Sequence, residues 1–103
     1  MNEVTTMQGL TPTITITVPT DTDLTEAGNV YPSIKQGKKV LRPQTFDVSE
    51  HQVDIYLSQA ETLELNPGGA EIQLNWTYPT GQRGATRPKP IMVDENQIKE
   101  VLP

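Results

Sequence analysis

The chain has 103 residues, of which 34% are hydrophobic, with a formal net charge of −5 and no cysteine. This length fits one domain with a thin core, and eight basic residues against thirteen acidic ones argue against nucleic-acid binding, which needs clustered Lys and Arg. No apolar run approaches the roughly 20 residues that cross a bilayer and the N-terminus lacks a signal-peptide pattern, so we expect a soluble protein without disulfides or thiol chemistry.

The N-terminal part predicts an arm followed by a strand. Residues 1–9 show no apolar period, and we expect them to form a flexible arm. Residues 13–18 alternate polar and apolar side chains, which predicts a strand with one buried face. The polar, turn-rich stretch 19–29 then predicts a connection with room for a single helical turn.

A hairpin is predicted next. Residues 30–35 alternate in the manner of a strand, and Pro32 has no N–H to donate, which places this strand at an edge or beside a bulge. Residues 36–38 form the expected turn, and 39–42 form the return strand. Pro43 ends that strand, and the sequence leaves the strand order beyond it open.

The clearest alternation lies at residues 52–58, which predict a strand with one buried and one solvated face. Ser58 and Glu61 then have the spacing of a capping box, in which each side chain accepts a hydrogen bond from the other residue's backbone N–H. We therefore expect one short helical turn near residues 59–63, followed by a Pro- and Gly-rich turn at 66–69.

The C-terminal part predicts one long strand and a disturbed partner. Residues 70–78 alternate throughout, and 83–93 return beside them. Pro88 and Pro90 interrupt the ladder of that partner, so strand order there stays open. Residues 94–103 are expected to form a tail with room for a short helix.

Several short strands at spacings of roughly 8–12 residues, separated by turn signals, predict an all-β sandwich or small barrel. We assign this domain to residues 10–93. Its expected core has ten members: Ile14, Ile16, Ile34, Val53, Ile55, Leu57, Leu63, Ile72, Leu74 and Trp76.

The single histidine invites a hydrolase interpretation that the spacing does not support. His51 follows Asp47 and Ser49 at steps of two. Residues two apart on a strand lie ~6.6 Å apart along it, beyond the reach of a serine hydroxyl to an imidazole. We expect His51 to be a solvated turn residue.

Three carboxylates in six residues, Asp21, Asp23 and Glu26, resemble the oxygen-rich loops that bind Ca²⁺. The loop lacks the Gly and Glu that an EF-hand needs at its sixth and twelfth positions. A polar loop is favoured, with cation binding left open. We therefore predict no catalytic, cofactor-binding or metal-ligating residue, and no enzyme activity.

Aromatic side chains offer a second class of function. Trp76 shares a face with Ile72 and Leu74, which favours core packing. Tyr31, Tyr56 and Tyr78 could stack on sugar rings if they lay together. A carbohydrate- or surface-binding sandwich is therefore the alternative hypothesis.

Five short segments occur in an order that resembles a known family. They read DLTEA at 23–27, VYPSIKQG at 30–37, LSQAETL at 57–63, PGGAEIQLNW at 67–76 and GQR at 81–83. The series resembles small immunoglobulin-like β-sandwich proteins encoded in tail and baseplate regions of prophages in Gram-positive bacteria. The resemblance implies an antiparallel immunoglobulin-like sandwich with a virion structural or assembly role, and it transfers no catalytic residue.

The first functional hypothesis follows from this resemblance. The protein is expected to be non-enzymatic and to bind other phage tail or baseplate proteins, or copies of itself, through open strand edges, the N-terminal arm and the C-terminal tail. It is expected in the virion or in the host bacterial cytoplasm during assembly, with no contact to nucleic acid or membrane.

Overall fold

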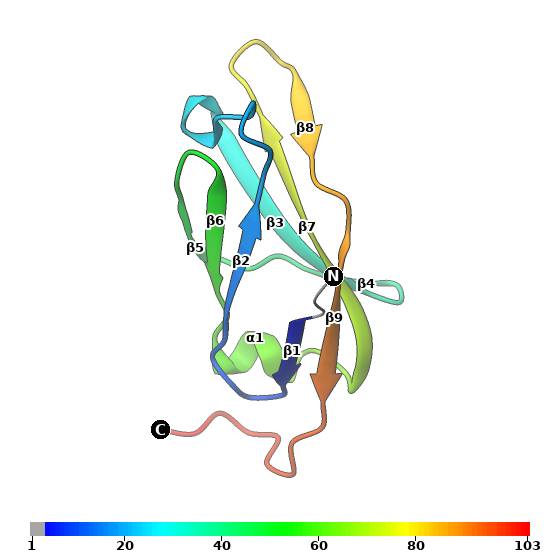
Figure 1. Cartoon of the computed structure of the whole chain (residues 1–103). Helices are drawn as coiled ribbons and strands as arrows, with labels where there is room; N and C mark the ends of the chain where they lie inside the picture. Colours follow the sequence, from blue (N-terminus) through cyan, green and yellow to red (C-terminus); the bar gives the residue numbers. More distant parts are fainter. Residues whose placement is uncertain (1–3) are drawn as a thin grey trace.

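The computed structural model describes residues 4–103 and shows an all-β sandwich, which confirms the predicted fold class (Figure 1). The larger sheet has the strand order β1 (Val4–Met7), β9 (Lys89–Asp94), β7 (Gly68–Thr77), β3 (Asn29–Gln36), β4 (Lys39–Leu41), with β8 (Arg83–Ala85) also paired to β7. The smaller sheet has the order β2 (Thr13–Thr17), β6 (Gln52–Tyr56), β5 (Thr45–Val48).

The distribution of strands between the sheets is that of an immunoglobulin-like sandwich. We take β2, β3 and β4 as strands B, C and C′, and β5, β6 and β7 as strands D, E and F. With β8 and β9 together as strand G, the smaller sheet becomes B-E-D and the larger sheet contains G-F-C-C′. All pairings are antiparallel except that of β1 with β9, which is parallel. The strand β5 is not among the predicted elements, because residues 45–48 are mostly exposed and lack a clear alternation.

The core lies between the sheets and contains nine of the ten predicted residues. The exception is Leu63, which is only half-buried. In the helix α1 (Gln59–Leu63), Thr62 faces the core instead, and Leu65, three residues further on, closes that end at 1% exposure. Further core residues outside the predicted list are Val18, Leu24, Leu41, Ala70, Ile91 and Val93.

The short helix begins as predicted. The Ser58 hydroxyl accepts from the Glu61 backbone N–H at 3.2 Å, and a Glu61 carboxylate oxygen accepts from the Ser58 N–H at 2.9 Å. Both parts of the capping box are present, so two N–H groups of the first turn are satisfied. A 3₁₀ turn, η1 (Leu24–Glu26), also forms inside the predicted connection.

Both chain ends differ from the expectation. Residues 4–7, predicted as part of a flexible arm, form β1 and pair with β9, while residues 1–3 lie outside the described part of the chain. The C-terminal segment 95–103 contains no helix and runs irregularly along the base of the sandwich (Figure 1). Hydrogen bonds to the side chain and backbone of Gln8 and to the side chain of Gln59 hold this segment in place.

The prolines explain the positions where strand order was open. Pro32 lies on the stretch of β3 that pairs with β7 on one side and has no strand on the other, as expected for an edge. Pro43 is buried where the chain crosses from the larger sheet at β4 to the smaller sheet at β5.

A bulge separates β8 from β9. Ala85 pairs with Asn75 and Lys89 pairs with Ile72. An advance of four residues from β8 into β9 therefore matches an advance of only three residues along β7. The extra residue falls around Pro88, and such an insertion bends an edge strand away from its partner. The predicted interruption of the last strand is therefore confirmed, and its form is a bulge.

Candidate docking surfaces

The residues around His51 do not form a nucleophile–base pair. The His51 Nδ1 atom lies 2.7 Å from the carbonyl oxygen of Thr22, so this nitrogen carries the hydrogen and donates to it. Ser49 donates to a backbone carbonyl, and Asp47 accepts from the Tyr56 hydroxyl at 2.9 Å. His51 thus fixes the loop that contains Thr22, and neither of its predicted neighbours contacts the imidazole.

The carboxylate loop is used for local structure. The Asp23 carboxylate accepts from the Thr25 hydroxyl at 2.5 Å and from the Thr25 N–H at 2.9 Å, which caps η1. These hydrogen bonds, that of the hydroxyl first, hold the pKa of Asp23 below its usual value. Within residues 4–103, no three His, Asp or Glu side chains lie close enough together to hold a metal ion.

The tyrosines do not form one platform. Tyr31 lies on the outer face of the larger sheet and Tyr56 on the outer face of the smaller sheet, so they point to opposite sides of the sandwich. Tyr78 is half-buried, and its hydroxyl accepts from Trp76 Nε1 at 3.2 Å. Trp76 is 5% exposed, as predicted for a core residue. The alternative hypothesis of a carbohydrate-binding sandwich needs tyrosines that lie together, and these do not.

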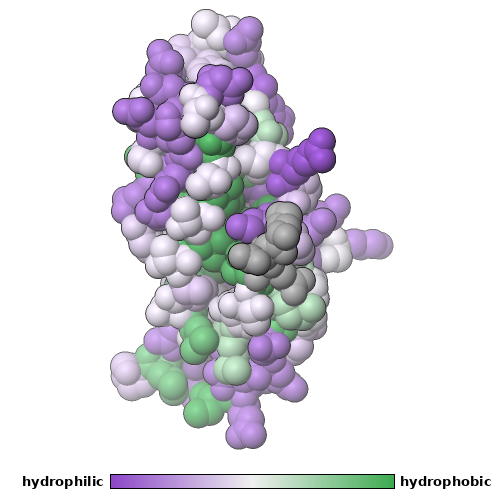
Figure 2. All heavy atoms as spheres, viewed as in Figure 1, coloured by the Kyte–Doolittle hydropathy of each residue, from purple (hydrophilic) through white to green (hydrophobic). Residues whose placement is uncertain are grey.

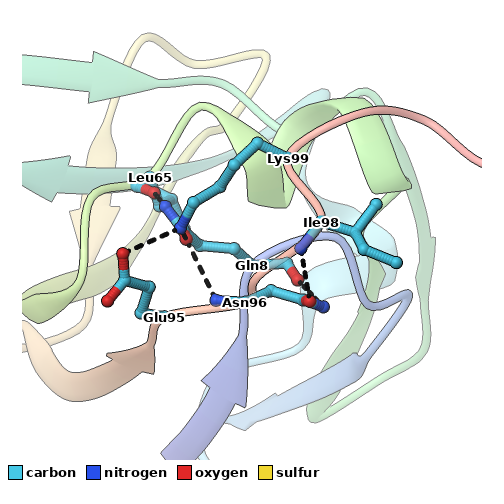
Figure 3. A network of polar contacts seen from close by, with 6 residues as sticks. All are labelled: Gln8, Leu65, Glu95, Asn96, Ile98 and Lys99. Atoms are coloured by element: carbon cyan, nitrogen blue, oxygen red, sulfur yellow. Dashed lines mark hydrogen bonds and ion pairs between the residues drawn. The ribbon is translucent and has the colours of Figure 1, made fainter.

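A polar cluster at the base of the sandwich was not predicted, because its members are far apart in sequence. We call it the Gln8 clamp: Gln8, which is 5% exposed, with Leu65, Asn96 and Lys99 (Figure 3). The Gln8 amide nitrogen donates to the Leu65 carbonyl at 2.8 Å. Its amide oxygen accepts from Lys99 Nζ at 2.6 Å and from the Asn96 N–H at 3.2 Å.

Further hydrogen bonds hold the C-terminal segment against the same end. Asn96 Nδ2 donates to the Gln8 carbonyl at 3.0 Å. The Gln59 side chain donates to the Leu102 carbonyl at 3.0 Å and accepts from the Leu102 N–H at 2.8 Å, which imitates a strand pairing. Thr62 of the same helix donates to the Leu10 carbonyl at 2.8 Å. Chain segments before β2 and after β9 are thereby fixed around α1.

These fixed segments display apolar side chains to solvent. We call this set the basal patch, and its exposed fractions are 49% for Leu10, 49% for Ile98, 57% for Val101 and 49% for Leu102. Figure 2 shows apolar atoms at the base of the molecule. The sequence placed Ile98, Val101 and Leu102 on one side of a helix; they are instead held in irregular backbone.

A second surface covers the outer face of the larger sheet. A shallow hollow of about 370 Å³ is lined by residues that include Tyr31, Val40, Arg42 and Arg83. The Arg42 guanidinium lies 5.5 Å from the centre of the Tyr31 ring, a cation–π distance. Arg83 donates to the Asn75 side-chain oxygen at 3.0 Å. We call it the sheet-face hollow, and it is more polar than the basal patch.

No helix within residues 4–103 is long and apolar enough to span a membrane. No protein-family model matches the chain, and no curated protein matches it.

Proposed function

We propose that the protein is a non-enzymatic structural or assembly component of a phage or prophage tail or baseplate, which acts by binding other proteins of that assembly. The tail or baseplate context comes from the five ordered segments of the sequence. The observation that carries the binding role is the basal patch, an apolar surface on chain segments that the Gln8 clamp holds in place.

The clamp orders a segment that has no helix or strand of its own, residues 95–103. Such irregular surface segments are commonly mobile unless other parts of the fold hold them. Here Gln59 binds the backbone of Leu102, and Lys99 binds Gln8, while Ile98 and Val101 remain largely in solvent. The hydrogen bonds therefore order a segment without burying its apolar side chains.

This arrangement favours association with a partner. Fully burying an aliphatic side chain contributes about 1.5–3 kcal/mol, and a side chain that is half exposed still has about half of that to gain. Because the segment is already fixed, a partner does not have to supply its ordering entropy. A docking surface gains affinity from such preorganisation.

The proposal is tested on particles and on the isolated complex. We expect mass spectrometry of purified tails from an induced culture to detect the protein, and light scattering to show a complex with a protein encoded beside its gene. Ile98→Asp and Leu102→Asp should abolish that complex. Val40→Asp is the control, because Val40 is at least as exposed as these two residues, at 57% against 49%, but lies in the sheet-face hollow.

Two results would count against the proposal. One is a set of neighbouring genes that encode metabolic enzymes and no tail or baseplate proteins, together with absence of the protein from purified particles. The other rejects the basal patch as the interface: a complex that Val40→Asp disrupts and the basal variants do not would place the contact in the sheet-face hollow.

A further inference from the structure

One edge of the smaller sheet has free backbone groups. The Val18 N–H donates to the His51 carbonyl and the Pro12 carbonyl accepts from the Leu57 N–H, at 2.8 and 3.1 Å. These bonds show which residues of β2 hydrogen-bond to β6: the backbone N–H and C=O groups of its even-numbered residues point toward β6. Those of Thr13, Thr15 and Thr17 point the other way, where no described strand pairs with β2.

This edge lacks the protection found at the open edges of β3, β4 and β5. Lys38 and Lys39 lie at the turn of β4, Asp47 lies on β5, and Pro32 lies on the open stretch of β3. Charged residues and prolines at such positions discourage another strand from pairing. The sequence of β2, TITIT, contains neither.

An apolar opening lies beside this edge, between the sheets. It has a volume of about 450 Å³, and its lining includes Ile16, Ile72 and Trp76. Arg87 and Pro88 also line it, so the bulge between β8 and β9 borders this space. Figure 2 shows apolar atoms at the surface in the middle of this side of the molecule.

The rim of the opening is positively charged. Arg87 and Lys89 line it, and no acidic residue does so among the described residues. Within residues 4–103, the ion pairs are those of His51 with Glu50 and of Lys99 with Glu95, so neither rim cation is paired there. An incoming segment with carboxylates would therefore be favoured.

We propose that the β2 edge accepts an extended segment of another protein, which adds a fourth strand to the smaller sheet. The backbone of the segment pairs with Thr13, Thr15 and Thr17, its alternate apolar side chains enter the opening above Ile72, and its Asp or Glu residues meet the rim cations. The inference rests on the proposed function, because the segment would belong to one of the proteins that the proposed function has this chain bind. A second copy of this chain fits less well, because β2 has no carboxylate to meet the rim.

The test uses a synthetic peptide that alternates Val or Ile with Thr and has Glu at both ends. Trp76 is the only tryptophan and lines the opening, so its fluorescence reports binding. Because Trp76 is only 5% exposed, we expect a saturable shift of its emission when the peptide packs against the edge of the ring. A peptide N-methylated along its pairing edge should give no shift, and one with Lys in place of Glu should bind more weakly.

Two variants of one residue isolate the backbone contact. The Thr15 N–H points away from β6, so Thr15→Pro removes a free donor and leaves the β2–β6 ladder intact. Thr15→Ala keeps this donor and loses the same side-chain bond to Asp54, which makes it the matched control. One backbone hydrogen bond with added steric exclusion corresponds to roughly tenfold weaker binding, so we expect this loss for Thr15→Pro and none for Thr15→Ala.

Three outcomes would overturn the inference. They are no saturable signal at millimolar peptide, equal binding of the N-methylated peptide, and a dimer of the free protein that Thr15→Pro abolishes, since that would make the occupant a second copy. Failure of the proposed function is separate from these. If the basal patch is not an interface, Ile98→Asp and Leu102→Asp leave partner binding unchanged while the peptide result stands.

Discussion

Leu74 gives the sharpest test of the core. It lies on the central strand β7, is 0% exposed, and pairs across to Pro32 on β3. Leu74→Ala removes three carbon atoms, which at about 0.8 kcal/mol each contribute about 2.4 kcal/mol of transfer free energy. The remaining cavity adds to this, because close-packed neighbours relax only in part, so we expect a loss of about 2–5 kcal/mol.

Such a loss is large for one domain, whose total stability is about 5–15 kcal/mol. Urea unfolding followed by Trp76 fluorescence measures it, and the melting temperature should fall by about 4–8 °C for each kcal/mol at this size. Val40→Ala, on the exposed outer face, is the control and should change stability by less than about 0.5 kcal/mol. If Leu74→Ala also cost less than about 0.5 kcal/mol, the assignment of the buried face of β7 would be wrong.

Three further predictions concern other parts of the molecule. A Cβ on Gly84 would lie 2.5 Å from the Trp76 ring, so we expect Gly84→Ala to cost about 1–3 kcal/mol and to shift Trp76 fluorescence, whereas Gly69→Ala, which has open space, should not. The Asp47 hydrogen bond raises the pKa of Tyr56 above 10.0, so this contact stabilises the fold below pH 10 and is lost as pH rises through the folded pKa. Ultraviolet titration should show the raised pKa of Tyr56, and Asp47→Ala, which removes the acceptor and its charge, should lower that pKa toward the ordinary tyrosine value. The net charge of −5 opposes self-association, so light scattering should show a monomer or weak dimer at low salt and stronger association as the Debye length falls from ~10 Å at 0.1 M to ~3 Å at 1 M; a constant monomer mass in both would refute this.

Local patterns were sufficient for most of the strands. The alternation at 13–18 and 52–58 predicted β2 and β6, and the Ser58 capping box predicted the start of α1. These signals work because the backbone itself imposes a period of two on a strand and leaves free N–H groups at the start of a helix. The prolines likewise marked an edge and a bulge, since each lacks a donor.

Non-local pairing explains what the sequence analysis missed. The short strand β1 is held by β9, more than eighty residues away, and nothing within its four residues signals that partner. The Gln8 clamp is similar, because a glutamine is ordinarily a solvated residue and only the meeting of Leu65, Asn96 and Lys99 makes it a buried one. The sequence indicated the open strand edges and the C-terminal tail as contact regions, but the side chains that gather in the basal patch and beside β2 depend on such non-local meetings.

The two proposed contacts lie close enough for one partner to use both. Leu10 of the basal patch is three residues before Thr13, where the free edge of β2 begins, and three extended residues span at most about 10 Å. A segment paired to β2 that continues toward the base would therefore reach Leu10 and the fixed C-terminal segment. Joining two modest contacts in one partner raises the effective concentration of the second, so affinity exceeds that of either surface alone. This geometry favours a partner that adds a strand and continues into a contact with the base.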